Sequence, residues 1–259
     1  SYEIFRAAYT GQGGMIMKIV IVGYGTMGHL LLSRIEEKED LQCVGLIASS
    51  YYREIAELPQ HPEVIVDVSH PDNFARIERA MQRQPIPLIF LDHMMPEMDG
   101  IETRRNMLSD EGNLCRQVPI VMTSNFSIGM TIVNKMLKTC QREIAQYFDC
   151  DILEIHHEQK KDKPSGSALM LKKTLQGLST DRYGYQKPIS VTSLRHRQIA
   201  GEHTVILCGD HEQITITHIA DSREIFIRGI LEAVEAIPML SAGLYSMEDL
   251  LRQRLGLRR

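Results

Sequence analysis

The chain has 259 residues, of which 43% are hydrophobic and 24% charged, a composition typical of one large or two modest folded domains. A net charge of -4 argues against nucleic acid as the main partner, because phosphate binding needs a concentrated basic surface. No apolar run approaches the roughly 18 residues that span a bilayer, so we expect no membrane association. The five cysteines show no CxxC spacing and cannot all pair, which favours a reducing, cytoplasmic location.

The first half of the chain alternates apolar strands with helical segments. Strands are expected at 17–22, 42–47, 64–68, 87–91 and 118–122. A helical pattern follows the first strand, and an amphipathic helix is expected from 128 to 147, with Asn125 or Ser127 as its cap. Strands that alternate with helices predict an α/β, Rossmann-like, doubly wound parallel sheet.

The pattern changes after residue 152. A strand, a lysine-rich loop and a helix from 166 to 178 are followed by three strands without long helices between them. These strands are expected at 189–194, 202–208 and 213–220, and a last helix at 222–236. This half therefore predicts an α+β domain with a mixed sheet. We expect residues 1–126 and 237–259 to form a dinucleotide-binding domain and residues 127–236 a substrate-binding and oligomerisation domain.

A G-x-G-x-x-G motif, Gly23 to Gly28, stands at the first strand-to-helix turn. The first glycine permits the turn, the second lets the backbone approach a pyrophosphate, and the third lets helix and strand pack closely. The start of the helix, at Thr26 and Met27, adds free N–H groups and a partial positive charge. A dinucleotide is favoured over an empty glycine-rich turn.

The second strand ends without the acidic residue that an NAD-preferring site usually carries there. Ser49 and Arg53 follow it instead, and a hydroxyl and a guanidinium suit a 2'-phosphate. NADPH is thus preferred over NADH, although an ordinary solvated loop explains these two residues equally well.

The densest chemical signal runs from Glu154 to Ala168, EIHHEQKKDKPSGSA, between a strand and a helix. Ser165 opens the helix, whose N–H groups and hydroxyls suit a carboxylate, and nearby lysines add charge and a proton donor. A zinc site at His156 and His157 is disfavoured, because adjacent residues on a strand point to opposite faces. We expect no bound metal.

This loop resembles the E-x-H-H-x-x-K-x-D-x-P-S-G-[ST]-A signature of dihydrodipicolinate reductases, which use NAD(P)H to reduce a cyclic imine dicarboxylate in lysine and diaminopimelate biosynthesis. Five further segments are similar to the family: VGYGTMG at 22–28, DVSHPDN at 67–73, TSNFSIGM at 123–130, SLRHRQIAGEHTV at 193–205 and GLYSMEDLL at 243–251.

The resemblance implies a role for each matching residue. His156 would be the acid/base group and Lys160 the proton donor to the substrate nitrogen, while His157, Ser165, Gly166 and Ser167 would hold the carboxylates. Taken together with the glycine motif and the end of the second strand, the expected contacts with NADPH or NADH come from Gly23, Gly25, Thr26, Met27, Gly28, Ser49, Arg53, Ser124, Asn125 and Phe126. The resemblance also implies a homotetramer built through the sheet of the second domain.

One segment departs from the family. Residues 87–103, PLIFLDHMMPEMDGIET, resemble the phospho-acceptor strand and loop of a response-regulator receiver domain, and the likeness extends to about 123. In a receiver, Asp92 would take a phosphoryl group and Thr123 would be the switch hydroxyl. The acidic pair that holds magnesium in receivers is missing here, which disfavours phosphotransfer. Bulky residues at 91–94 replace the family's small nicotinamide loop, so we expect reduced turnover.

Three functions therefore remain open. The first, and the leading hypothesis, is a dihydrodipicolinate reductase whose turnover is reduced or lost where the altered loop blocks the nicotinamide. The second is a non-catalytic or signalling hybrid in which the segment around Asp92 governs partner binding. The third is another Rossmann reductase that acts on a different small dicarboxylate.

Overall fold

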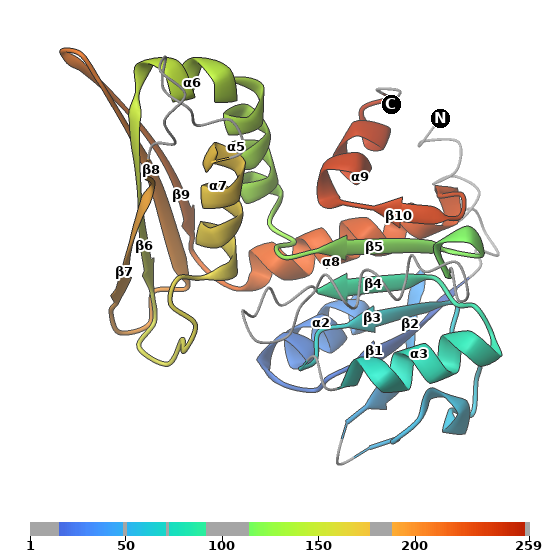
Figure 1. Ribbon diagram of the computed structural model, residues 1–259. Helices are drawn as coiled ribbons and strands as arrows, with labels where there is room; N and C mark the ends of the chain where they lie inside the picture. The colour runs from blue at the N-terminus through green and yellow to red at the C-terminus, as the bar shows by residue number, and fades with distance from the viewer. Residues whose placement is uncertain (1–15, 49–50, 71–72, 92–113, 177–187, 257–259) are drawn as a thin grey trace. The chain divides into compact units, whose positions relative to one another are not determined.

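A computed structural model describes residues 16–48, 51–70, 73–91, 114–176 and 188–256 (Figure 1). The chain divides into two compact units, which are treated separately below. The first unit comprises Ser1–Phe126 and Ile227–Arg259, and the second comprises Ser127–Phe226. Within the described ranges, every helix is too short or too polar to cross a membrane.

The first unit is built on a six-stranded parallel sheet in the order β10-β5-β4-β3-β1-β2. Its strands are β1 (Met17–Val22), β2 (Leu41–Ile47), β3 (Val64–Asp67), β4 (Leu88–Leu91), β5 (Pro119–Thr123) and β10 (Gly243–Tyr245). Its helices are α2 (Thr26–Glu36), α3 (Phe74–Arg83), most of α8 (Glu224–Ala236) and α9 (Met247–Arg254), with short 3-10 turns at Ile55–Glu57, Leu114–Arg116 and Ile237–Met239. The expected Rossmann-like sheet is confirmed.

The central strands of this sheet are mostly apolar; the exceptions in β1 and β3 are Lys18 and Asp67. Ile19, Val20, Ile21 and Val22 of β1 are fully buried, as are the first three residues of β3. Parallel strands covered on both faces need such continuous β-branched runs rather than alternation. Because all strands of the sheet are parallel, the C-terminal ends of β1, β3 and β5 lie at the same edge. The glycine turn follows β1 at this edge.

The second unit has a four-stranded mixed sheet in the order β7-β6-β8-β9. Its strands are β6 (Asp149–His156), β7 (Ser190–Arg195), β8 (Gly201–Gly209) and β9 (Glu212–Ala220). β6 pairs parallel with β7, and β8 pairs antiparallel with both β6 and β9. The expected mixed sheet is confirmed.

Helices cover one face of this second sheet (Figure 1). They are α5 (Ile128–Thr139), α6 (Gln141–Tyr147) and α7 (Gly166–Gln176). The single helix expected over 128–147 is wrong, because the backbone of Cys140, with φ -102° and ψ 15°, ends α5 and starts α6. Ser127 caps α5 by accepting a hydrogen bond from the N–H of Met130 at 3.2 Å, so Ser127 rather than Asn125 is the cap.

The helix-facing side of the second sheet is apolar at one end of its strands and polar at the other. At one end Ile152, Val205 and Ile216 face one another across three strands and pack against α5 and α7. Two residues further along, the same face carries Glu154 and His203, which are direct partners in the β6–β8 register. The buried titratable side chains of Glu154 and His203 therefore lie at the end of the sheet next to the loop that follows β6.

Candidate active site

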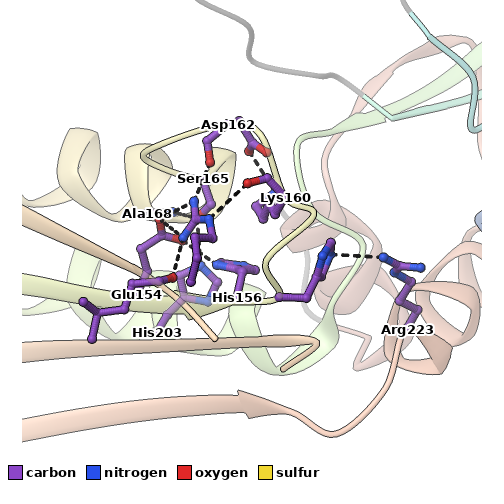
Figure 2. Close-up of polar contacts among 11 residues, drawn as sticks. Glu154, His156, Lys160, Asp162, Ser165, Ala168, His203 and Arg223 are labelled. Carbon is purple, nitrogen blue, oxygen red and sulfur yellow. Dashed lines mark hydrogen bonds and ion pairs between the residues drawn. The ribbon is translucent and has the colours of Figure 1, made fainter. Parts of the chain in front are cut away.

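The predicted His-Lys loop connects β6 to α7 within the second unit (Figure 2). His156 is the last residue of β6 and Gly166 the first of α7, so the loop spans 157–165. Ser165 stands before the first turn of α7, where its Oγ accepts a hydrogen bond from the N–H of Ala168 at 3.2 Å. The start of a helix carries a partial positive charge, which favours an anion at this position.

His156 lies in a buried ion-pair network (Figure 2). Its side chain is 8% exposed, and its Nδ1 is 2.5 Å from Oε2 of Glu154, which is fully buried. The other carboxylate oxygen of Glu154, Oε1, accepts hydrogen bonds at 3.1 Å from Nη1 and Nη2 of Arg195. A buried carboxylate needs such partners, since an unpaired one would be strongly destabilising.

His203 completes this network from β8. Its ring lies edge-on to that of His156, with centroids 4.9 Å apart. Its Nε2 is 3.0 Å from Oγ of Ser165, so the same hydroxyl that caps α7 is also tied to the sheet. The start of the helix is thereby fixed against the strands that carry the two histidines.

His157 and Lys160 lie on the more accessible side of the loop. Nε2 of His157 is 3.1 Å from Nη2 of Arg223, which precedes α8 (Figure 2). Nζ of Lys160 forms an ion pair with Oδ2 of Asp162 at 2.8 Å, and its side chain is 24% exposed. The two histidines therefore have different neighbours: His156 is held by the sheet, and His157 is half-buried beside a cation.

The charges of these groups follow from their surroundings. Burial raises the pKa of Glu154, but hydrogen bonds from His156, Ser193 and Ser165 outweigh it and hold that pKa well below its usual range. Burial, and then the charge of His156, lowers the pKa of His203 to about 3, so its ring is neutral at neutral pH. Burial, followed by the charge of Arg223, lowers the pKa of His157.

Glu154, His156 and His203 also have ligand atoms within 4.8 Å of one another, an arrangement that resembles a cation site. Two observations oppose a cation there. The guanidinium of Arg195 already neutralises Glu154. The 2.5 Å between Glu154 and His156 is shorter than the roughly 3 Å expected between ligands of one zinc ion. The histidine that approaches His156 is His203 of β8, not its neighbour His157.

The glycine turn of the first unit meets the steric demands of a dinucleotide site. Gly23 has φ +95°, and a Cβ there would lie 2.7 Å from the Cα of Ser69, while a Cβ at Gly28 would overlap the carbonyl oxygen of Gly23. Both positions therefore require glycine. A Cβ at Gly25 would meet no atom within 4 Å, which leaves open space at the start of α2. No acidic residue lies in the first turn, from Thr26 to Gly28, that would repel a phosphate.

The other predicted cofactor residues differ in their surroundings. Ser49 lies outside the described residues, and Arg53 is exposed, with its main-chain N–H donating to Glu57 at 3.1 Å. Ser124 follows β5 directly, and Asn125 is 7% exposed. Phe126 is 1% exposed, so its side chain packs in the interior and only its main chain could reach a cofactor.

Four residues of the site received no role from the sequence: Glu154, Arg195, His203 and Arg223. Strand alternation places Glu154 on the same face as His156, which could have suggested a contact. Arg195 and His203 depend on the pairing of β7 and β8 with β6, which the sequence pattern does not contain. In the receiver-like segment, Asp92 and the rest of 92–113 lie outside the described residues.

Comparison with known proteins identifies the family. The family model described as "Dihydrodipicolinate reductase, C-terminus" matches residues 129–251. The 4-hydroxy-tetrahydrodipicolinate reductase of Wolinella succinogenes is 31% identical over 95% of this chain and 98% of its own length. The enzyme of that name from Exiguobacterium sibiricum is also 31% identical, over 92% of this chain and 97% of its own.

A solved structure of a similar protein agrees with the fold. The dipicolinate-bound dihydrodipicolinate reductase of Paenisporosarcina sp. TG-14 superposes with a TM-score of 0.65 and 16% identity, over 90% of this chain and 98% of that one. This likeness supports the fold, and the family follows from the sequence relatives. The chain belongs to the 4-hydroxy-tetrahydrodipicolinate reductase family.

Proposed function

We propose that this protein catalyses the NAD(P)H-dependent reduction of 4-hydroxy-tetrahydrodipicolinate to tetrahydrodipicolinate, a step of lysine and diaminopimelate biosynthesis. The observation that carries the proposal is the convergence of His156, Lys160 and the capped start of α7 within one unit. Cofactor binding is assigned to the first unit and substrate binding to the second. All five cysteines are free thiols, which supports a reducing cytoplasm.

The substrate is a dicarboxylate, and the second unit offers donors for both of its carboxylates. Gly166 and Ser167 at the start of α7 supply donors for one, while the Ser165 hydroxyl, held by Ala168 and His203, fixes the start of that helix. The guanidinium of Arg223 with His157 supplies charge for the other, since charge-assisted hydrogen bonds to carboxylates are strong. Two anion-binding groups at fixed positions orient the ring between them.

Reduction needs a hydride at one atom of the substrate and a proton at another. The nicotinamide supplies the hydride when it is bound. Nζ of Lys160 is the proton donor to the substrate nitrogen, and the ion pair with Asp162 at 2.8 Å orients it. His156 is the acid/base group that exchanges protons with the site. For the cofactor itself, Gly25 leaves the space that a pyrophosphate needs beside the start of α2.

A homotetramer built through the second sheet is part of the proposal. The face of that sheet turned away from α5 and α7 carries no described helix of its own unit. Apolar side chains are exposed on it, among them Leu194 at 37% and Ile219 at 60%. Exposed apolar side chains on a face without helices suit contact with a second copy.

The alternative, a signalling hybrid acting through Asp92, has less support. Asp92 lies outside the described residues, and the relatives carry the reductase name. Thr123 would be the switch hydroxyl of a receiver domain. Here its Oγ1 donates a hydrogen bond to the carbonyl of Asn125, two residues along the chain, at 2.9 Å. The same gap contains residues 92–94, on which the expected loss of turnover depends, so that expectation stays a prediction.

The test is consumption of NADPH with freshly generated 4-hydroxy-tetrahydrodipicolinate, alongside calorimetry of NADPH binding. Lys160→Ala should lower kcat about 100-fold, since general acid catalysis is worth about that much or more. Lys161→Ala is the matched control, because Lys161 is exposed on the same loop. Turnover by the native chain with equal loss in both variants would remove Lys160 from its role. Binding without turnover would place the defect at residues 91–94.

A further inference from the structure

The strongest feature that the proposed function leaves unused is the ion pair behind His156. Glu154 is fully buried, and Arg195 reaches it from β7 with a side chain only 11% exposed. Burying two charges costs free energy that their attraction only partly returns, so a protein gains little stability from such a pair. The pair therefore needs an explanation other than stability.

Arg195 joins two parts of the site. Its Nη1 and Nη2 donate to Oε1 of Glu154, each at 3.1 Å. Its Nε donates to the carbonyl of Lys160 at 3.2 Å, and its Nη2 also donates to the carbonyl of Asp162 at 2.5 Å. One guanidinium thus fixes both the carboxylate that contacts His156 and the main chain that carries Lys160.

Glu154 in turn determines how His156 carries its proton. Because Oε2 of an ionised carboxylate can only accept, its 2.5 Å contact with Nδ1 favours the tautomer that carries the hydrogen on Nδ1. In the neutral ring, Nε2 is then the basic nitrogen. Nε2 faces Gly201, where a Cβ would lie only 3.1 Å from it. The absent side chain leaves the space beside the nitrogen that exchanges the proton.

Among the described groups of this network, His203 could be a further cationic partner of Glu154 only if its ring were charged. His203 is the direct cross-strand partner of Glu154, but burial keeps its ring neutral, with a pKa of about 3. The groups facing His156 are therefore Glu154 on its own strand, Arg195 on β7, and His203 with Gly201 on β8.

We propose that Glu154 and Arg195 are positioning residues of the reductase: Arg195 clamps Glu154 and the Lys160 loop together, and Glu154 holds His156 with Nδ1 protonated and Nε2 free for proton transfer. This inference rests on the proposed function of His156 and Lys160. It adds a physical link between them, so that one arginine sets the geometry of both.

The test compares two substitutions with matched controls. Glu154→Gln removes the charge at constant shape, and Arg195→Lys keeps the charge but loses the forked donors. Glu158→Gln and Arg197→Lys are the controls, since both residues are exposed on neighbouring loop positions. Each test variant should lower kcat about 100-fold with KM changed less than about threefold, because misplaced proton-transfer groups impair the reaction more than binding. The controls should retain the native kcat.

A second readout does not depend on turnover. Nitrogen-15 NMR of labelled histidines should show His156 as a single Nδ1-protonated tautomer in the native chain. In Glu154→Gln the amide can donate to Nδ1, so the tautomer should change, and Glu154→Asp should restore it in part. If the native chain has no turnover, the proposed function fails, while the tautomer still reports whether Glu154 orients the ring.

Gly201→Ala is the alternative test variant if Glu154→Gln does not fold. The new Cβ should displace the His156 ring by a few tenths of an ångström and lower kcat, with the Nδ1 tautomer retained. Native kcat in Gly201→Ala, or native kcat and tautomer in a folded Glu154→Gln, would overturn the proposal. Stoichiometric zinc bound through His156 in the purified protein would also overturn it, in favour of a metal site at Glu154, His156 and His203.

Discussion

Ser165 and His203 join the start of α7 to the second sheet, with Oγ and Nε2 3.0 Å apart. The same arrangement occurs a second time: Oγ of Ser127, which caps α5, lies 3.1 Å from Nε2 of His218. His203 and His218 are direct partners in the β8–β9 register. Two helices of one unit are thus held by capping serines that contact neighbouring histidines of the sheet.

Ser165→Ala should destabilise the protein more than the loss of an ordinary cap. Losing a serine cap costs about 1 kcal/mol, and a buried histidine nitrogen left without its partner adds about 1 to 3 kcal/mol. Ser246→Ala is the control, because Ser246 caps α9 by accepting from the N–H of Asp249 but contacts no histidine in the described structure. Urea unfolding should show the larger loss for Ser165→Ala. Equal losses of unfolding free energy in the two variants would mean that the contact between Ser165 and His203 does not stabilise the protein.

Substitutions in the glycine turn should separate folding from cofactor binding. Gly25→Ala should leave the unfolding free energy nearly unchanged, because its Cβ meets no atom within 4 Å, yet weaken NADPH binding by filling that space. Gly28→Ala should destabilise the first unit, since its Cβ would overlap the carbonyl oxygen of Gly23. Calorimetry and thermal unfolding of both variants check this. Undiminished NADPH affinity in Gly25→Ala would place the pyrophosphate elsewhere.

Asp67 should make the stability of the first unit depend on pH. Burial raises the pKa of this carboxyl from 3.8 to about 6, although Ser69 donates to it from its main-chain N–H and its hydroxyl. Because the pKa of Asp67 is higher in the folded chain than in the unfolded chain, protonated Asp67 favours the folded state. Its contribution to the free energy of unfolding is complete below pH 3.8 and is lost as the pH rises to about 6. The loss amounts to about 3 kcal/mol as an upper figure.

Asp67→Asn removes this titration. The difference in unfolding free energy between the variant and the native chain should therefore shift in favour of the variant as the pH rises from about 4 to about 7. Urea unfolding at both pH values measures it. A difference that stays constant across this range would show that the carboxyl titrates alike in the folded and unfolded chain.

Ile219→Lys tests the proposed tetramer. Ile219 is 60% exposed on the sheet face turned away from the helices, so lysine there should leave the monomer fold intact and add charge to a contact between copies. Light scattering should show a smaller species than the native chain. Ile132→Lys, at a 49% exposed position on α5, is the control and should leave the assembly unchanged. A native chain that is already monomeric would exclude the tetramer.

The sequence by itself determined the layout of the elements and the chemistry of the loop. Continuous β-branched runs predicted the buried parallel strands, because such strands are covered on both faces. The glycine spacing predicted a turn that the structure shows to require glycine at Gly23 and Gly28. These are local properties of the chain. The break between α5 and α6 at Cys140 was missed, since the amphipathic pattern continues across it.

Only the tertiary structure decided which side chains of the site meet. Alternation along β6 puts Glu154 and His156 on one face, but a shift of one residue in the pairing of β8 would turn His203 to the other face. Arg195 reaches Glu154 and the carbonyl of Lys160 only because β7 pairs in parallel with β6. Strand register is set by packing of the whole sheet, so the sequence named the catalytic candidates but not the residues that orient them.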